Sequence, residues 1–340
     1  MTGIAARGRG YAATLGGVLT RALPRRRNSE PPSIRPAGGR EQTVVDRYWG
    51  RHTVRAPGFV SRRSSRRYLE WRFAEYPLFR ELTGLWGEHR GEVVLDFGCG
   101  PGNDLTGLAL YTGARRLIGV DVSEQALALA GRRLALHGVD PGRTQLIQIG
   151  DSDPTLPLET ASVDYAQSLG VIHHTSDPGA VLREIRRVLK PGARACVMVY
   201  NRESVWFHLY TAYERMIRDR AFAGLDVEQA FARNTDGEEC PIARCYRAEE
   251  FVELCQGAGF EAEFVGGYLS RRELRSLEAS WATALADDRL GAEHRLFLRG
   301  LSFDASGLPM IGGYHAGIGG VYRLRKPEKH AAIVSEPQAS

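Results

Sequence analysis

A short apolar run that passes directly into a glycine-rich turn is the first feature of this sequence that indicates chemistry. Residues 93–95 are apolar, Asp96 follows them, and Gly98, Gly100 and Gly102 stand at alternate positions. Glycines let a backbone approach a ligand closely, and a nucleotide-like ligand of a doubly wound sheet binds beyond the carboxyl end of the first strand. A carboxylate beside a pyrophosphate is unfavourable. Asp96 therefore favours a ligand that carries an ammonium or sulfonium group.

Two further acidic residues follow apolar runs in the same way. Asp121 ends the run 117–120, and its two carboxylate oxygens suit a vicinal diol. Asp151 follows Gly150 after the run 146–149. Each acid has a structural alternative: Asp121 could cap the next helix, although Ser123 is the better cap, and Asp151 could be an exposed turn residue.

These features together resemble the class I S-adenosylmethionine (SAM)-dependent methyltransferases. The resemblance is close over residues 92–200, where 164–174 and the Leu-Lys-Pro-Gly turn at 189–192 also match, and it extends in layout over 246–326. It implies SAM as the cofactor, with Asp121 accepting hydrogen bonds from the ribose hydroxyls and Asp151 near the adenine amino group. The residues expected to bind the cofactor are Asp96, Gly98, Gly100, Gly102, Asp121, Val122, Asp151, Ser152 and Ser168.

The adjacent residues His173 and His174 follow the fourth expected strand, next to where the methyl group would be transferred. Histidine titrates near neutral pH, so either residue could be a general base or an orienting group. The resemblance adds that Ile-His-His is frequent here in small-molecule and quinone-ring methyltransferases. The alternative is that one imidazole only packs in the loop. No metal is expected, because adjacent histidines cannot easily bind one ion.

From residue 90 onward, β-branched runs alternate with helical patterns, which predicts a parallel sheet with crossover helices. We expect strands at 93–95, 117–120, 146–149, 163–169, 196–199, 260–265 and 320–324. The fold class is α/β, and the resemblance implies a Rossmann-like, doubly wound, mostly parallel seven-stranded sheet with an antiparallel last strand. A long helix is expected near 204–217, followed by an irregular stretch and a helix at 247–256.

The predicted domain organisation has four parts. They are a disordered Arg-rich leader (1–40), a helical cap that contributes to the substrate site (41–90), a SAM-binding methyltransferase domain (91–326) with an insertion at about 268–316, and a disordered tail (327–340). Aromatic residues of the cap and of the segment after 199 are expected around the substrate. They are Tyr48, Trp49, Tyr68, Trp71, Tyr200, Trp206, Tyr210 and Tyr213, with Asn201 and His208 nearby. The arginines at 62, 63, 66 and 67 could meet an anionic substrate or face solvent, and we expect the latter. The glycine-rich loop 312–317 could fold back on the active site.

The charge distribution argues against a nucleic-acid substrate. The net charge is +5, but residues 1–40 hold eight arginines and one glutamate and so carry +7, which leaves −2 for the remainder. Nucleic-acid methylation would favour a basic face and an Asn-Pro-Pro-Tyr-like sequence where this chain has residues 167–170. No apolar run is long enough to span a membrane, although the leader could be a targeting or membrane-touching segment. Five dispersed cysteines suit a reducing cytoplasm.

The sequence therefore predicts a cytoplasmic, SAM-dependent methyltransferase that acts on an oxygen or nitrogen atom of a small-molecule metabolite, possibly in a specialised biosynthetic pathway. Methylation of carbon in a quinone-like ring and a non-catalytic SAM-binding role are the alternatives. A nicotinamide-dependent oxidoreductase is disfavoured by the glycine spacing. The sequence does not fix the acceptor or the oligomeric state.

Overall fold

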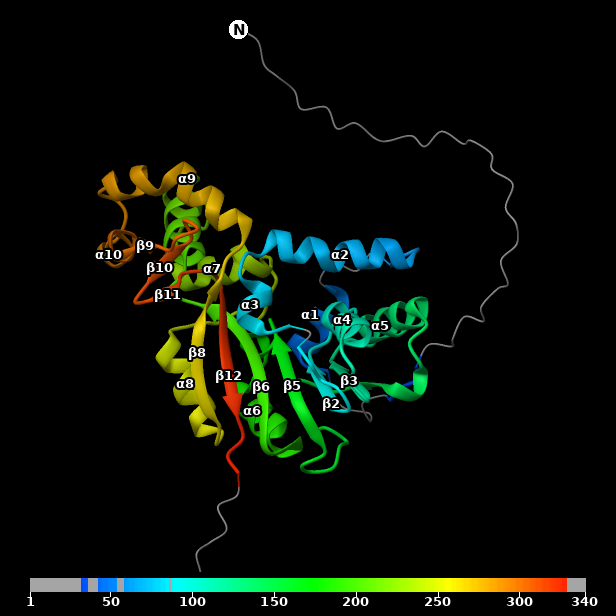
Figure 1. The fold of residues 1–340 in the computed structure, drawn as a ribbon. Helices are drawn as coiled ribbons and strands as arrows, with labels where there is room; N and C mark the ends of the chain where they lie inside the picture. The colour runs from blue at the N-terminus through cyan, green and yellow to red at the C-terminus, as the bar shows by residue number, and fades with distance from the viewer. Residues whose placement is uncertain (1–31, 36–41, 54–57, 86, 329–340) are drawn as a thin grey trace, which may run out of the picture.

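A computed structural model describes residues 32–35, 42–53, 58–85 and 87–328 of the chain (Figure 1). Its main sheet has the strand order β1-β4-β3-β2-β5-β6-β12-β8, and β7 pairs with β6. The strands are β1 (Ile34–Arg35), β2 (Val93–Phe97), β3 (Arg116–Asp121), β4 (Thr144–Gln148), β5 (Val163–Leu169), β6 (Leu189–Asn201), β7 (Cys245–Tyr246), β8 (Glu261–Tyr268) and β12 (Gly319–Arg325).

The seven longer strands confirm the expected doubly wound sheet. β2, β3, β4, β5 and β6 run parallel to their neighbours, whereas β12 is antiparallel to both β6 and β8. β2 is buried along its whole length, as expected for a central parallel strand that is covered on both faces. The acids at the ends of β2 and β3 are therefore brought to the same edge of the sheet.

Helices cover both faces of the sheet. The helices α4 (Asn103–Tyr111) and α5 (Glu124–His137) pack on one face, and α6 (Pro178–Val188) and α8 (Ala248–Gly257) pack on the other (Figure 1). Ser123 caps α5 through a hydrogen bond from the Ala126 amide, and Gly138 ends it in the left-handed conformation. These caps confirm the helix limits expected from the sequence.

The expected helical cap consists of α1 (Val44–Arg51), α2 (Arg62–Glu75) and α3 (Phe79–Thr83). α2 lies across the carboxyl ends of the strands (Figure 1). Ser65 anchors α2 to α5, because the buried Arg133 donates to its hydroxyl over 2.8 Å and His137 Nε2 lies 2.9 Å from the same oxygen. The side of α2 that carries Arg62, Arg63, Arg66 and Arg67 is exposed, which confirms that these residues face solvent.

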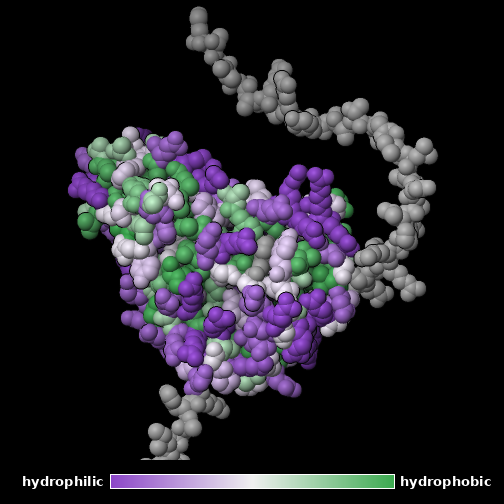
Figure 2. Space-filling view, in the orientation of Figure 1, coloured by the Kyte–Doolittle hydropathy of each residue, from purple (hydrophilic) through white to green (hydrophobic). Residues whose placement is uncertain are grey.

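The segment between β8 and β12, expected to be an insertion, forms a small additional layer that shares a hydrophobic core with the segment 205–217. It contains α9 (Arg271–Ala286), α10 (Ala292–Gly300) and a three-stranded sheet of β9 (Ser302–Phe303), β10 (Pro309–Ile311) and β11 (Tyr314–His315). Figure 2 shows apolar side chains gathered over this layer, where Leu296, Phe303 and Tyr314 are exposed. Gly312 and Gly313 form the β10–β11 turn. The expectation that the loop folds back on the active site is wrong, because none of residues 312–317 lines the main cavity.

The stretch expected to be irregular after residue 217 contains a helix that our sequence interpretation missed. α7 (Val227–Asp236) follows the helix η3 (Trp206–Arg218), which has π-type hydrogen bonding. Asp226 and Gln229 form a capping box at the start of α7. Because this pattern is a helix-start signal, it could have revealed α7.

The terminal segments fall largely outside the described residues. Within the leader, however, Ile34 and Arg35 pair in parallel with Leu146 and Ile147. The expectation of a wholly disordered leader is wrong at these residues, because the open edge of β4 offers backbone partners. The rest of the leader and most of the tail are not described. No helix among the described residues combines the length and apolar character that crossing a membrane requires.

Candidate active site

The turn after β2 adopts a conformation that favours glycine at all three expected positions. Gly98, Gly100 and Gly102 have φ of +79°, +52° and +76°. A Cβ on Gly98 would lie 2.2 Å from a methyl carbon of Val171, whereas a Cβ on Gly100 would meet nothing within 4 Å. The turn therefore packs tightly against the β5 loop at Gly98 and leaves open space at Gly100.

Asp121 lies at the end of β3 and connects to this turn. Its Oδ2 accepts a hydrogen bond from the Gly100 amide, and its Oδ1 accepts one from the Ser123 amide, both over 2.8 Å. Burial raises the pKa of this carboxyl. Each oxygen retains a second acceptor position, and Asp121 lines the main cavity.

Asp96 is buried under the turn rather than on the cavity wall. Its Oδ1 accepts a hydrogen bond from Gln167 over 3.1 Å, whereas its Oδ2 has no partner among the described residues. Burial, and secondarily the charge of Asp104, raises the pKa of Asp96 to about 8. Arg72 of the cap forms an ion pair with Asp104. The buried, unpartnered oxygen is a group that a cationic ligand would stabilise.

Of the four remaining residues expected to bind the cofactor, two line the cavity and two do not. Val122 and Asp151 line the cavity, but both Asp151 carboxylate oxygens accept hydrogen bonds from Ser176. Ser152 is exposed. Ser168 is fully buried in β5, and its hydroxyl has no partner among the described residues.

One cavity of about 500 Å³ extends from the glycine turn to the space under the cap. Cavities of roughly 300–1,000 Å³ hold drug-sized ligands. The aromatic lining comes from the cap and from the segment after residue 199, as expected, together with Phe97 of β2 and Tyr268 of β8. It includes Trp49, Tyr68, Trp71, Tyr76, Tyr200, Trp206 and Tyr268. Of the other side chains expected here, Tyr48, Asn201, His208, Tyr210 and Tyr213 are not among the lining residues.

The two adjacent histidines have different environments. His173 is fully buried, both of its ring nitrogens lack hydrogen-bond partners among the described residues, and burial holds its pKa well below the usual value. His174 lines the cavity, with its ring centroid 4.8 Å from that of Trp49. The structure therefore brings His174, and not His173, to the cavity.

A hydrogen bond defines which nitrogen of His174 is available. Nδ1 lies 2.6 Å from the Ile242 carbonyl oxygen. Because a carbonyl oxygen can only accept, Nδ1 carries the hydrogen, and in the neutral ring Nε2 has the lone pair. Burial lowers the pKa of His174, which favours this neutral form.

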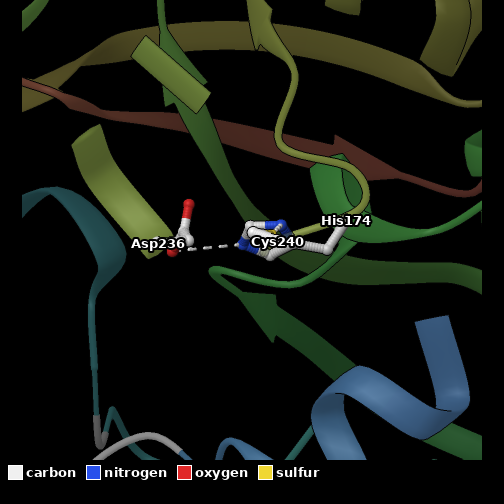
Figure 3. Close-up of side chains that lie close together, drawn as sticks. All are labelled: His174, Asp236 and Cys240. Carbon is white, nitrogen blue, oxygen red and sulfur yellow. Dashed lines mark hydrogen bonds and ion pairs between the residues drawn. The ribbon is translucent and has the colours of Figure 1, made fainter. Parts of the chain in front are cut away.

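Asp236, at the end of α7, was not identified from the sequence. It lines the cavity, and its Oδ1 lies 3.7 Å from His174 Nε2 and accepts a hydrogen bond from Tyr200 over 2.8 Å (Figure 3). Its Oδ2 is buried without a partner among the described residues. No local motif marks this residue, because only the tertiary fold brings α7 to the β5 loop.

Cys240 completes a cluster with His174 and Asp236 (Figure 3). Cys240 Sγ approaches the ring at Nδ1, 3.9 Å away, whereas Asp236 approaches Nε2. Nδ1 is already hydrogen-bonded, and burial raises the pKa of the Cys240 thiol to about 11. This arrangement does not direct the three groups at one metal ion, which would require a thiolate and a free nitrogen lone pair.

Comparisons with known proteins match the part of the chain that holds the glycine turn and the β5 loop. Residues 95–197 match the family described as "Methyltransferase domain". The chain is 32% identical over 215 residues to an uncharacterized 37.1 kDa transposon protein of Streptomyces fradiae, covering 58% of this chain and 56% of that protein. It is 32% identical to a ubiquinone biosynthesis O-methyltransferase of Idiomarina loihiensis, covering 33% of this chain and 44% of that protein.

A further relative is matched over more of its length. The chain is 29% identical to a 2-phytyl-1,4-naphtoquinone methyltransferase of Synechococcus elongatus, covering 56% of this chain and 80% of that protein. The chain spans about half the length of the first two relatives. Residues 95–197, which hold the glycine turn, Asp121 and β5, are thus similar to a methyltransferase domain.

Proposed function

We propose that the protein transfers the methyl group of SAM to an oxygen or nitrogen atom of a small-molecule metabolite. The observation that carries this proposal is the single cavity that joins the glycine turn and Asp121 to His174, Asp236 and the aromatic lining. It offers a polar end for the cofactor and an apolar, aromatic end for an acceptor. Such a lining favours a planar or largely apolar molecule.

The residues at the polar end fit the cofactor. Asp96 lies beneath the turn and does not line the cavity, so its carboxylate would act on the ammonium group of the cofactor through its charge. The free acceptor positions of Asp121 would accept from the ribose hydroxyls. The open space at Gly100 leaves room beside these groups. Val122 and Asp151 would lie along the adenine. Ser152 and Ser168 remain weaker candidates, because one is exposed and the other is buried in β5.

The protein's part in the reaction would be to hold the acceptor in line with the sulfonium and to exclude water. Bound SAM supplies an electrophilic methyl group and its own leaving group. The cap, which we propose is a distinct unit at 41–90, and the end of β6 would position the acceptor. His174, with its lone pair at Nε2, is the better placed of the two histidines to receive a proton.

Methylation of carbon in a quinone-like ring is a second candidate, favoured by the naphthoquinone methyltransferase among the relatives. A non-catalytic SAM-binding role is the third. To distinguish them, the purified protein is incubated with methyl-labelled SAM and small-molecule extracts, and products are identified by mass spectrometry. An acid-stable label on oxygen or nitrogen supports the proposal, and a label on ring carbon supports the second candidate. Binding of SAM without any labelled product favours the third.

A further inference from the structure

We propose that Asp236 and His174 act as one proton-accepting pair, in which the Asp236 carboxylate compensates the positive charge that His174 gains. This inference rests on the proposed function, because it names the group that receives the proton released by the methyl acceptor. Both residues line the same cavity, and His174 Nε2 lies 3.7 Å from Asp236 Oδ1.

The geometry gives each member of the pair a separate task. The Ile242 carbonyl fixes the hydrogen on Nδ1, so Nε2 can accept a proton. The Tyr200 hydroxyl donates to Asp236 Oδ1 over 2.8 Å, and Tyr48 donates to the Asp236 backbone carbonyl over 2.6 Å. Asp236 is thus held in place by two hydroxyl groups, one from α1 of the cap and one from the end of β6.

Charge explains why the pair would accept a proton. Asp236 Oδ2 is buried with no partner among the described residues, and a buried carboxylate without a cation is costly. Protonation of His174 places an imidazolium next to that carboxylate and makes the pair neutral. The Asp236 carboxylate would thereby help His174, a neutral base of low pKa, to take up the proton that the acceptor loses.

In the proposed step, the acceptor's lone pair would form a bond to the methyl carbon supplied by SAM, and the electron pair of the broken carbon–sulfur bond would stay on sulfur. His174 Nε2 would take up the acceptor proton, and Asp236 would stay ionised beside it. The other titratable or charged groups that face the pair are His173, Tyr48, Tyr200, Cys240 and Arg244.

The experiment is a histidine-detected NMR titration of the full chain, which has nine histidines. The His174→Gln variant assigns the His174 signals. We expect the neutral His174 ring to carry hydrogen on Nδ1, and we expect Asp236→Asn to shift its titration to lower pH because the compensating anion is lost. Glu238→Gln removes an exposed acid two residues away and should leave the titration unchanged.

Two results would overturn this inference. One is a neutral His174 ring that carries its hydrogen on Nε2, and the other is the same His174 titration in the wild type and in Asp236→Asn. Calorimetric titration of the same samples with SAM separates this inference from the proposed function. Failure of the wild type to bind SAM would reject the proposed function while leaving the coupling between the two side chains measurable. Normal SAM binding, together with a His174 titration that Asp236→Asn leaves unchanged, would reject the proton-accepting pair but not the proposed function.

Discussion

Tyr48 of α1 donates its hydroxyl hydrogen to the backbone carbonyl of Asp236, 188 positions later in the chain, over 2.6 Å. The same aspartate accepts the Tyr200 hydroxyl at its carboxylate. The Tyr48 hydroxyl therefore joins the cap to the acceptor end of the cavity at Asp236. Loss of this hydroxyl should affect the acceptor end more than the cofactor end, which the cap contacts through another residue, because Asp46 accepts a hydrogen bond from the Asp151 amide over 2.9 Å.

Tyr48→Phe tests this connection. The variant should lose about 1 kcal/mol of the free energy of unfolding, the usual contribution of one such hydrogen bond, and its SAM affinity should be unchanged because the glycine turn is not affected. Urea unfolding and calorimetry measure the two quantities. Tyr314→Phe, which removes the hydroxyl of an exposed tyrosine, should leave both unchanged. Equal stability of the two variants would mean that the Tyr48 hydrogen bond contributes little.

Asp121→Ala should weaken SAM binding at least tenfold, or about 1.4 kcal/mol, through the loss of charge-assisted hydrogen bonds to the ribose. Part of the effect would come from the turn itself, because the same carboxylate accepts from the Gly100 amide. Glu124→Ala, an exposed acid in the first turn of α5, is the matched control. Unchanged affinity in Asp121→Ala would show that the ribose binds elsewhere.

Gly98→Ala should destabilise the fold strongly, because the new Cβ would overlap the Val171 side chain and φ at this residue is +79°. Strain of this kind costs roughly 1–3 kcal/mol for the backbone and a similar amount for overpacking. The double variant with Val171→Ala removes both overlapping methyl groups but keeps the Val171 Cβ, 2.8 Å from the new Cβ, so only part of the loss should be recovered. Thermal unfolding of the single and double variants checks this, and no recovery would place the cost in the backbone and in the remaining Cβ contact.

The rate of methyl transfer should fall when the solution is acidified. Burial lowers the pKa of His174 below its usual 6.5, so the neutral base form persists at pH 7 and is lost only as the pH falls through that lowered pKa. A pH profile of kcat measures this, with acid loss expected below pH 6.5. A profile that instead rises on acidification would exclude a neutral imidazole as the base.

His174→Gln should reduce kcat by about 10²–10⁴-fold, the usual contribution of a general base, with SAM affinity retained. His173→Gln is the comparison, because that side chain is buried away from the cavity and should mainly lower stability. Single-turnover kinetics and urea unfolding separate the two outcomes. Equal loss of kcat with equal stability in both variants would contradict the different environments of the two rings.

The sequence by itself determined the parts of this protein that depend on local pattern. The alternation of β-branched runs and helical periodicity predicted the parallel sheet that β2 to β6 form. The antiparallel last strand was implied by the family resemblance, and β12 is indeed antiparallel to β6. The glycine spacing predicted the turn at Gly98, Gly100 and Gly102, because left-handed backbone there requires this residue type. Asp121 could be placed from sequence because it directly follows a buried strand.

Only the tertiary structure decided which groups meet at the acceptor end of the cavity. His173 and His174 are equivalent in sequence, but the packing of the β5 loop buries the first and exposes the second to the cavity. Asp236 lies at the end of α7, where no local motif marks it, and it reaches His174 because α7 packs against η3. Contacts between residues so distant in the chain depend on how whole elements pack, and this information is not contained in any short pattern of residues.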